Sequence, residues 1–318
     1  MRRLCVLAWL ALATPAFAAE EVVPGVMLVS GGHYVLGEQP DGNSVLFKAP
    51  DGAIVFDTGR HAAHTQAVID AAAAMGPRVA AVINSHWHLD HVGGNPMIRQ
   101  AFPGVRIYAS DAIKAARTGF LATYRQDLES EIAKVADPAQ KDTMRAEIAR
   151  IDAGKALEPD DVITASGPRA VAGRTLDINL ERNAVTAGDV WVFDPETRVL
   201  IAGDLVTLPA PFFDTACPQR WGEALKRLDR ADFSTLIPGH GPALSRAQFA
   251  AYRTAFDKLL RCAGSTASND ACTTGWLQDA GALVPETEQK TAKALIGYYM
   301  DASLRAPKEK LSKLCGAP

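Results

Sequence analysis

The chain has 318 residues, of which 48% are hydrophobic, and it carries 33 lysines and arginines against 36 aspartates and glutamates. This length and apolar fraction suffice for one substantial hydrophobic core. The near balance of charge argues against a nucleic-acid-binding protein and against a basic membrane-surface protein.

Residues 1–18 have the pattern of a secretory signal peptide. Two arginines precede the apolar run CVLAWLALA, and the AFA of residues 16–18 offers a small-x-small cleavage site. A retained membrane anchor is disfavoured because the run is shorter than the ~20 residues of a spanning helix. We therefore expect a periplasmic or secreted protein whose mature chain begins near Ala19 and does not insert into a membrane.

Two hairpins with a shared pattern are predicted at residues 43–59 and 189–205. Each has an apolar strand, a turn built on PDG or DPET, and a second apolar strand that ends in an acidic residue beside glycine. This weak internal repeat indicates two similar halves that pack sheet against sheet.

Helix and strand alternate after the first hairpin. The Ala-rich run VIDAAAAMG predicts a helix, and VAAVIN (79–84) and VRIYAS (105–110) predict strands. Residues from about 112 to 156 have apolar side chains at helical spacing and are expected to form a helical insertion. Strands return between about 162 and 206 and again in TLIPG. A helical extension is predicted over 245–318, starting at a capping box of Ser245 and Gln248.

Polar side chains that can bind metal follow four of these strands. Asp57 follows AIVF, the segment SHWHLDHVGGN (85–95) follows VAAVIN, Asp204 follows VLIAG, and His240 follows TLIPG. Because the ends of neighbouring strands meet at one edge of a sheet, imidazole and carboxylate groups should gather there. That mixture suits zinc and similar divalent ions.

The candidate ligands exceed the needs of one tetrahedral zinc: they are His86, His88, Asp90, His91, Asp204 and His240. In an extended loop His86 and His88 point to the same side, while Asp90 and His91 can serve a second position. Two metals about 3.5–4 Å apart could use the set, with Asp204 as a bridge. The Gly-Gly that follows is expected to let the chain turn tightly. A purely structural role for the histidines is disfavoured.

The chain resembles the metallo-β-lactamase superfamily in FDTG, SHWHLDH, AGDLV and IPGHGP, over about residues 25–245. The resemblance implies an α/β fold, a four-layer αββα sandwich at residues 19–244, with the helical insertion within it and the extension packed on it. It implies that His86 and His88 bind a first metal, that Asp90, His91 and His240 bind a second, and that Asp204 bridges them. It also implies that Asp57 orients a ligand.

One departure from the family concerns the first metal. The family usually has a further histidine in a segment resembling GHTPG, whereas this chain reads AVTAGD and has Val185 at that position. The first site then keeps three ligands, and it could hold metal weakly, recruit another group or be empty. Asn183 and Asp189 are candidates for compensation.

The remaining histidines are expected to lie outside the metal site. His61 and His64 follow DTGR at a helix start and are interpreted as solvated, and His33 as structural or surface. Phe212, Phe213 and Trp221 could line a substrate pocket or belong to the core.

Four cysteines remain after signal cleavage: Cys217, Cys262, Cys272 and Cys315. An even number in an oxidising compartment predicts disulfides. Cys262–Cys272 is expected because it closes the short loop AGSTASNDA, and Cys217–Cys315 follows by elimination. A zinc site is disfavoured because no C-x-x-C pair is present.

These features together predict a metal-dependent hydrolase. Zinc is the expected cofactor, as one or two ions, with iron or manganese left open, and Asp90 is the expected catalytic residue beside a metal-activated water. The partner is a small-molecule substrate, such as a β-lactam, thioester, lactone or related ester, and the number of subunits is left open. The alternative is a binding or accessory protein with an incomplete first site, motivated by Val185.

Overall fold

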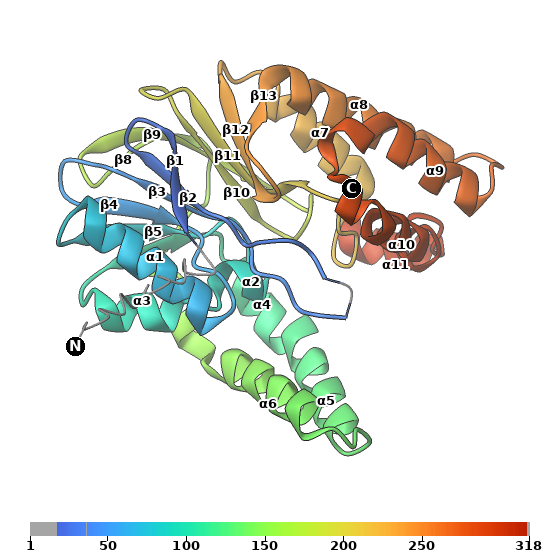
Figure 1. Ribbon diagram of the computed structural model, residues 1–318, viewed down its shortest axis with the longest axis horizontal. Coiled ribbons are helices and arrows are strands. Elements are labelled where there is room, and N and C mark those ends of the chain that lie inside the picture. The colour runs from blue at the N-terminus through green and yellow to red at the C-terminus, as the bar shows by residue number, and fades with distance from the viewer. Residues whose placement is uncertain (1–17, 36, 317–318) are drawn as a thin grey trace, which may run out of the picture.

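A computed structural model describes residues 18–35 and 37–316, so residues 1–17 of the predicted signal peptide lie outside the described residues. Two β-sheets pack face to face and helices cover both outer faces (Figure 1). This arrangement confirms the predicted four-layer αββα sandwich. Within the described residues, no helix combines the length and the apolar character needed to cross a membrane.

The first sheet has seven strands in chain order. Its first four strands pair antiparallel and β4 to β7 pair parallel. The strands are β1 (Ala19–Val23), β2 (Val26–Val29), β3 (Ser44–Phe47), β4 (Ala53–Phe56), β5 (Val79–Ile83), β6 (Arg106–Ala109) and β7 (Asp161–Val162).

Within the part of the chain that the structure describes, the second sheet has six strands in the order β13-β12-β11-β10-β9-β8, of which only β11 and β12 pair parallel. The strands are β8 (Gly167–Val171), β9 (Arg174–Glu181), β10 (Asp189–Asp194), β11 (Val199–Thr207), β12 (Thr235–His240) and β13 (Leu244–Ser245). Each predicted hairpin is an antiparallel pair, β3 with β4 in one sheet and β10 with β11 in the other.

The core between the sheets follows from side-chain alternation along the strands. Val45 and Phe47 of β3 pack inward against the second sheet, while Leu46 packs outward beneath α1 (Ala62–Met75). Because both faces of the strand are buried, its sequence reads as a continuous apolar run. Burial of each such side chain stabilises the fold by roughly 1.5–3 kcal/mol.

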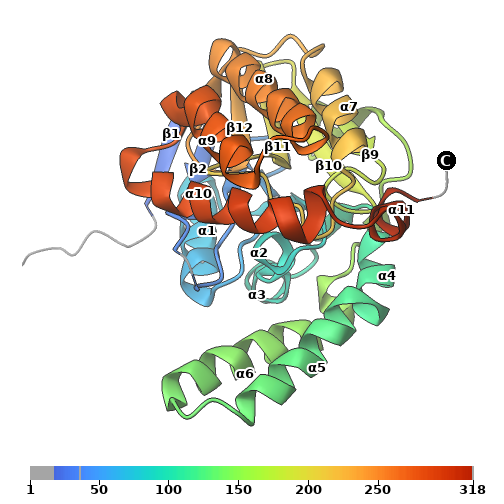
Figure 2. The same ribbon diagram turned by 90° about the vertical axis from the view of Figure 1, so that its right-hand side faces the viewer.

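The remaining helices lie on the outer faces and at one end of the sandwich. Beside the first sheet lie α2 (Leu89–Val92) and α3 (Asn95–Ala101), and beside the second lie α7 (Pro218–Leu228), α8 (Arg246–Ala263), α9 (Asn269–Ala280), α10 (Gln289–Tyr299) and α11 (Lys308–Cys315) (Figures 1 and 2). The predicted capping box of Ser245 and Gln248 starts α8.

The helices between β6 and β7 project from the body of the protein. They are α4 (Ala112–Thr118), α5 (Phe120–Ile132) and α6 (Pro138–Asp152), and α5 and α6 lie side by side (Figure 2). Helix α6 begins where the Asp137 carboxylate accepts a hydrogen bond from Ala139 N and proline occupies the first helical position. Pro138 therefore separates α5 from α6.

Both predicted disulfides are present. Cys262–Cys272 joins the end of α8 to α9, and Cys217–Cys315 ties α11 to the residue before α7. These bridges anchor the C-terminal helices, which share a hydrophobic cluster with the second sheet.

We expect denatured, unreduced mature protein to titrate no free thiol. The bridges close loops with sequence separations of 98 and 10 residues. Loop-closure entropy therefore predicts that the double variant Cys217→Ser/Cys315→Ser loses about 4–5 kcal/mol of the free energy of unfolding. The double variant Cys262→Ser/Cys272→Ser should lose about 3 kcal/mol. Denaturant unfolding of both double variants measures the costs. Four titratable thiols, or equal costs, would contradict this expectation.

Candidate metal centre

The candidate ligands gather where two parallel strand pairs end. Asp57 follows β4, and the histidine segment follows the adjacent strand β5. In the other sheet Asp204 lies within β11 and His240 ends the adjacent strand β12. Parallel neighbours present their carboxyl ends at the same edge. The two sheets therefore bring all four segments to one end of the sandwich.

Two groups of side chains have ligand atoms within 4.8 Å of one another: His86, His91 and Asp204, and Asp90, His91 and His240. His91 belongs to both groups. Asp204 also reaches both, because its Oδ2 lies 3.7 Å from His86 Nε2 and its Oδ1 lies 3.5 Å from His240 Nε2. The second group has the composition implied by the resemblance, and Asp204 has the position of a bridge.

Several buried polar atoms at this centre lack a hydrogen-bond partner within the described part of the chain: His86 Nε2, His91 Nε2, His240 Nε2 and both Asp204 carboxylate oxygens. A buried polar atom without a partner costs about 1–3 kcal/mol. Five of them facing one another would be strongly unfavourable unless a cation lay among them. The donor set of imidazole nitrogens and carboxylates therefore fits a divalent metal.

Asp57 and Ser85 fix the tautomers of two histidines. Asp57 Oδ2 lies 2.8 Å from His91 Nδ1 and accepts a 2.7 Å hydrogen bond from Ser85 Oγ, which lies 2.9 Å from His86 Nδ1. Protons on both Nδ1 atoms complete this chain and leave both Nε2 atoms as free acceptors. Asp57 thus holds the position of the orienting acid that the resemblance implies, and it does so at φ 60°, a conformation that aspartate tolerates.

His88 is oriented by a different chain of hydrogen bonds. Thr215 Oγ1 donates to the Val185 carbonyl at 2.9 Å, so it must accept at 2.9 Å from His88 Nε2. The Nδ1 of His88 is then the unprotonated nitrogen. The ring centroids of His88 and His86 lie 4.4 Å apart, although His88 joins neither of the two ligand groups.

We expect Thr215→Val to weaken metal binding about 10–100-fold, because the hydroxyl that fixes the His88 tautomer is removed. Thr215→Ser keeps a hydroxyl and should keep the affinity. Competition against a chelator measures both variants. Equal affinities in the valine variant and the wild type would mean that His88 takes no part in binding metal.

Val185 supplies no ligand atom from its side chain, which is fully buried in the cluster beneath the C-terminal helices. Asp189 is used elsewhere: its carboxylate accepts hydrogen bonds from the backbone nitrogens of Val185 and Thr186 and from the Thr186 hydroxyl. Burial raises the pKa of Asp189 to about 7, against these hydrogen bonds. Asp189 therefore stabilises the turn and does not replace the missing histidine.

The charged groups at the centre shift one another's pKa values. Burial opposes the charged form of His91, but the Asp204, Asp90 and Asp57 carboxylates outweigh it and raise its pKa well above the ordinary value. Burial and the neighbouring imidazoles lower the pKa of His86. The carboxylates of Asp204, Asp90 and Asp57 thus favour a positive charge at this place.

Arg60 links Asp90 to the helical insertion. Its guanidinium pairs with Glu147 of α6 and lies 3.4 Å from Asp90 Oδ1, and all three side chains are buried. Glu147 is also paired with Arg150, at 2.8 Å. The insertion therefore helps to fix the Asp90 carboxylate, which is predicted from the sequence to be catalytic.

One expectation about a neighbouring residue was wrong. His64 is fully buried and its Nε2 lies 2.9 Å from Ser44 Oγ, and burial lowers its pKa to about 4. The chain turns at Gly93 and Gly94 between α2 and α3, as expected, although Gly94 does so at an ordinary φ of −81°. A Cβ there would lie 2.2 Å from the Thr58 carbonyl oxygen, so close packing requires the glycine. His33, as expected, lies at the surface, paired with Glu288.

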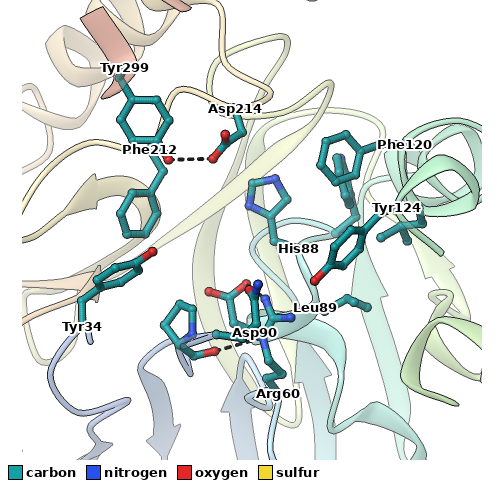
Figure 3. Close-up of a pocket in the computed structure, with 14 residues that line it drawn as sticks. Tyr34, Arg60, His88, Leu89, Asp90, Phe120, Tyr124, Phe212, Asp214 and Tyr299 are labelled. Atoms are coloured by element: carbon teal, nitrogen blue, oxygen red, sulfur yellow. Dashed lines mark hydrogen bonds and ion pairs between the residues drawn. The ribbon is translucent and has the colours of Figure 1, made fainter. Parts of the chain in front are cut away.

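A cavity of about 230 Å³ opens beside the centre and is lined by fourteen residues, including His88 and Asp90 (Figure 3). Phe212 lines it, whereas Phe213 and Trp221 are buried in the core. The C-terminal helices and the helical insertion both contribute to its walls. The cavity is therefore the candidate substrate pocket.

Three supporting residues, Arg60, Ser85 and Thr215, were not predicted from the sequence. Arg60 directly follows the FDTG motif and Ser85 precedes His86, so proximity to a motif could have suggested them. Thr215 carries no local signal, because its partners lie 127 and 30 residues away.

Comparison with known proteins places this centre in a family. The family model described as the metallo-beta-lactamase superfamily matches residues 38–240, well over half of the chain. Two curated relatives are hydroxyacylglutathione hydrolases: the one from Gloeobacter violaceus is 42% identical over 65 residues, 18% of this chain and 26% of that protein. The one from Acaryochloris marina is 41% identical over 49 residues, 15% of this chain and 19% of that protein. The chain thus matches only about a quarter or less of either relative's length.

Solved structures share the fold at low identity. A metallo-beta-lactamase from Pontibacter korlensis has a TM-score of 0.54 at 20% identity, covering 76% of this chain and 99% of its own. The mono-zinc form of FIM-1 from Pseudomonas aeruginosa has a TM-score of 0.55 at 17% identity, covering 76% and 95%. The sec-alkylsulfatase Pisa1 from Pseudomonas sp. has a TM-score of 0.62 at 18% identity, covering 92% and 52%.

Proposed function

The chain belongs to the metallo-beta-lactamase superfamily, and from that premise we propose that it is a zinc-dependent hydrolase of a small-molecule ester, thioester, lactone or β-lactam. The observation that carries the proposal is the convergence of buried, unpartnered nitrogens and carboxylate oxygens beside an open cavity. A divalent metal bound there would lower the pKa of a water molecule to about 7 and polarise the bond to be cleaved.

The residues around the centre have distinct tasks in this proposal. Asp57 holds the proton on His91 Nδ1, and Ser85 accepts the proton of His86 Nδ1, so each ring presents Nε2 to the metal. Asp90 keeps Oδ1 toward Arg60, while its Oδ2 lies 3.1 Å from His240 Nε2. The Asp90 carboxylate can therefore bind metal and accept a hydrogen bond from the attacking water.

A binding or accessory role is the second candidate, favoured by the absence of a ligand side chain at Val185. A role without bound metal is opposed by the three histidine tautomers set by Asp57, Ser85 and Thr215, which a protein that binds no metal would not need. The two disulfides support the proposal that the protein is periplasmic or secreted, because such bonds persist in oxidising compartments.

Elemental analysis of the purified protein, joined to a panel of ester, thioester, lactone, lactam and phosphoester substrates, tests the proposal. We expect bound zinc, hydrolysis of at least one carbonyl substrate, loss of activity after chelation and recovery when metal is restored. Finding bound iron or manganese instead of zinc would change the identity of the metal and leave the proposed hydrolase activity standing. Metal-loaded protein that cleaves no member of the panel would favour the binding role.

A further inference from the structure

The substrate pocket has two aromatic walls. Trp87, Phe120 and Tyr124 form one, with neighbouring ring centroids 5.3 and 6.4 Å apart. The other consists of Tyr34, Phe212 and Tyr299, with neighbouring centroids 5.5 and 6.4 Å apart. Phe120 and Tyr124 lie opposite the second wall across the opening (Figure 3). A substrate that enters the pocket must therefore present flat or apolar surface beyond the bond that is cleaved.

Positive charge is already neutralised in this pocket. Arg60 is the one lysine or arginine among the fourteen lining residues. Its guanidinium pairs with Glu147 and Asp90, and its Nε donates to the Pro40 carbonyl at 3.0 Å. Binding a substrate carboxylate would require Arg60 to leave two buried carboxylates without their partner, which is strongly unfavourable.

A carboxylate without a cationic partner lies at the rim. Asp214 lines the pocket next to Tyr299, whose hydroxyl donates to Asp214 Oδ2 at 2.6 Å (Figure 3). Among the residues that the structure describes, no lysine, arginine or histidine forms an ion pair with Asp214. The rings of Tyr34, Phe212 and Tyr299 beside this carboxylate form the kind of surface that attracts an ammonium group. The faces of the neutral rings are electron-rich, and the carboxylate carries a negative charge.

From this distribution of charge we infer which substrates the pocket selects. The part of the substrate farthest from the cleaved bond, its distal group, should be cationic and apolar, such as a quaternary ammonium, and substrates with a distal carboxylate should be disfavoured. The inference rests on the proposed function and names its substrate class. Metal bound at the centre would add positive charge at the floor, where the bond to be cleaved must lie. The distal group would instead lie beside Asp214 and the wall of Tyr34, Phe212 and Tyr299.

Three aryl acetate esters test the inference: their para substituents are trimethylammoniomethyl, neopentyl and carboxymethyl, which differ in charge and are matched by a methylene spacer. We expect kcat/KM to fall in that order, with at least about a tenfold difference between the first and the last. Asp214→Asn should reduce the preference for the cationic over the neutral ester about fivefold. Asp127→Asn is the matched control, because it removes an exposed carboxylate of the insertion that does not line the pocket.

Calorimetry with benzyltrimethylammonium separates binding from catalysis. Asp214→Asn should weaken binding of this probe about fivefold, and Asp127→Asn should not. If the metal-loaded protein hydrolysed none of these esters, simple esters would be excluded from the proposed substrate classes, while binding that depends on Asp214 would still support the charge preference. A preference for the carboxymethyl ester, or probe binding that is the same in the wild type and Asp214→Asn, would overturn the inference.

Discussion

Replacement of His91 by alanine is expected to remove bound metal and to lower hydrolysis by at least about 10³-fold. His91 Nε2 is shared by both groups of ligand atoms, lying 3.2 Å from Asp204 Oδ1 and 3.5 Å from Asp90 Oδ2. Metal activation of water contributes several kcal/mol to catalysis, and about 4 kcal/mol corresponds to that loss of rate. Metal content by elemental analysis and turnover of the best panel substrate measure the effect.

Two single-group variants make this prediction sharper. His240→Ala and Asp90→Ala each remove a ligand atom from the group of Asp90, His91 and His240 and leave the ligand atoms of His86, His91 and Asp204 in place. Each should abolish hydrolysis with the fold preserved. His33→Ala is the control, because that histidine lies at the surface and pairs with Glu288. Circular dichroism checks the fold in every variant. Full turnover in His91→Ala or His240→Ala, with metal content unchanged, would show that the metal lies elsewhere.

Replacement of Arg60 by methionine is expected to lower the free energy of unfolding by about 3–5 kcal/mol. The change leaves the buried Asp90 carboxylate without its arginine and leaves Glu147 with Arg150 alone. Removing one partner of a buried ion pair has a cost of this size, because both carboxylates lose the cation that they share in a medium of low polarity. Denaturant-induced unfolding measures the loss.

Arg125→Met is the matched control for Arg60. Arg125 lies on α5 of the same insertion and pairs with Asp152 and Glu129 at the surface. Exposed pairs contribute about 0–1 kcal/mol, so this variant should unfold close to the wild type. Equal losses in the two variants would mean that the buried network of Arg60 has no special role in holding the insertion against the centre.

Local patterns in the sequence were enough to predict the two sheets, the helical insertion and the C-terminal helices. Val45, Leu46 and Phe47 alternate between the two faces of one strand, and such periodicity acts over a few residues. Both disulfides followed from the same kind of reasoning, since four cysteines with one short loop leave a single remaining pair.

The candidate ligands were predicted from their residue types and from their places after strands. Their close approach across two sheets matches that reasoning for His86, Asp90, His91, Asp204 and His240. The burial of His64 was missed, because a helix start gives no indication of which residues the neighbouring loop will cover.

The sequence by itself determined the fold, the family resemblance and the chemical types gathered at the centre, because those depend on short-range spacing and composition. The tertiary structure alone decided which nitrogen of His88 is free, that Arg60 is neutralised by Glu147, and that Asp214 lies beside an aromatic wall with no ion-paired cation among the described residues. These features join residues 85 to 127 positions apart. Hydrogen bonds and ion pairs act over a few ångströms in space, so segments so distant along the chain interact only after folding has brought them together.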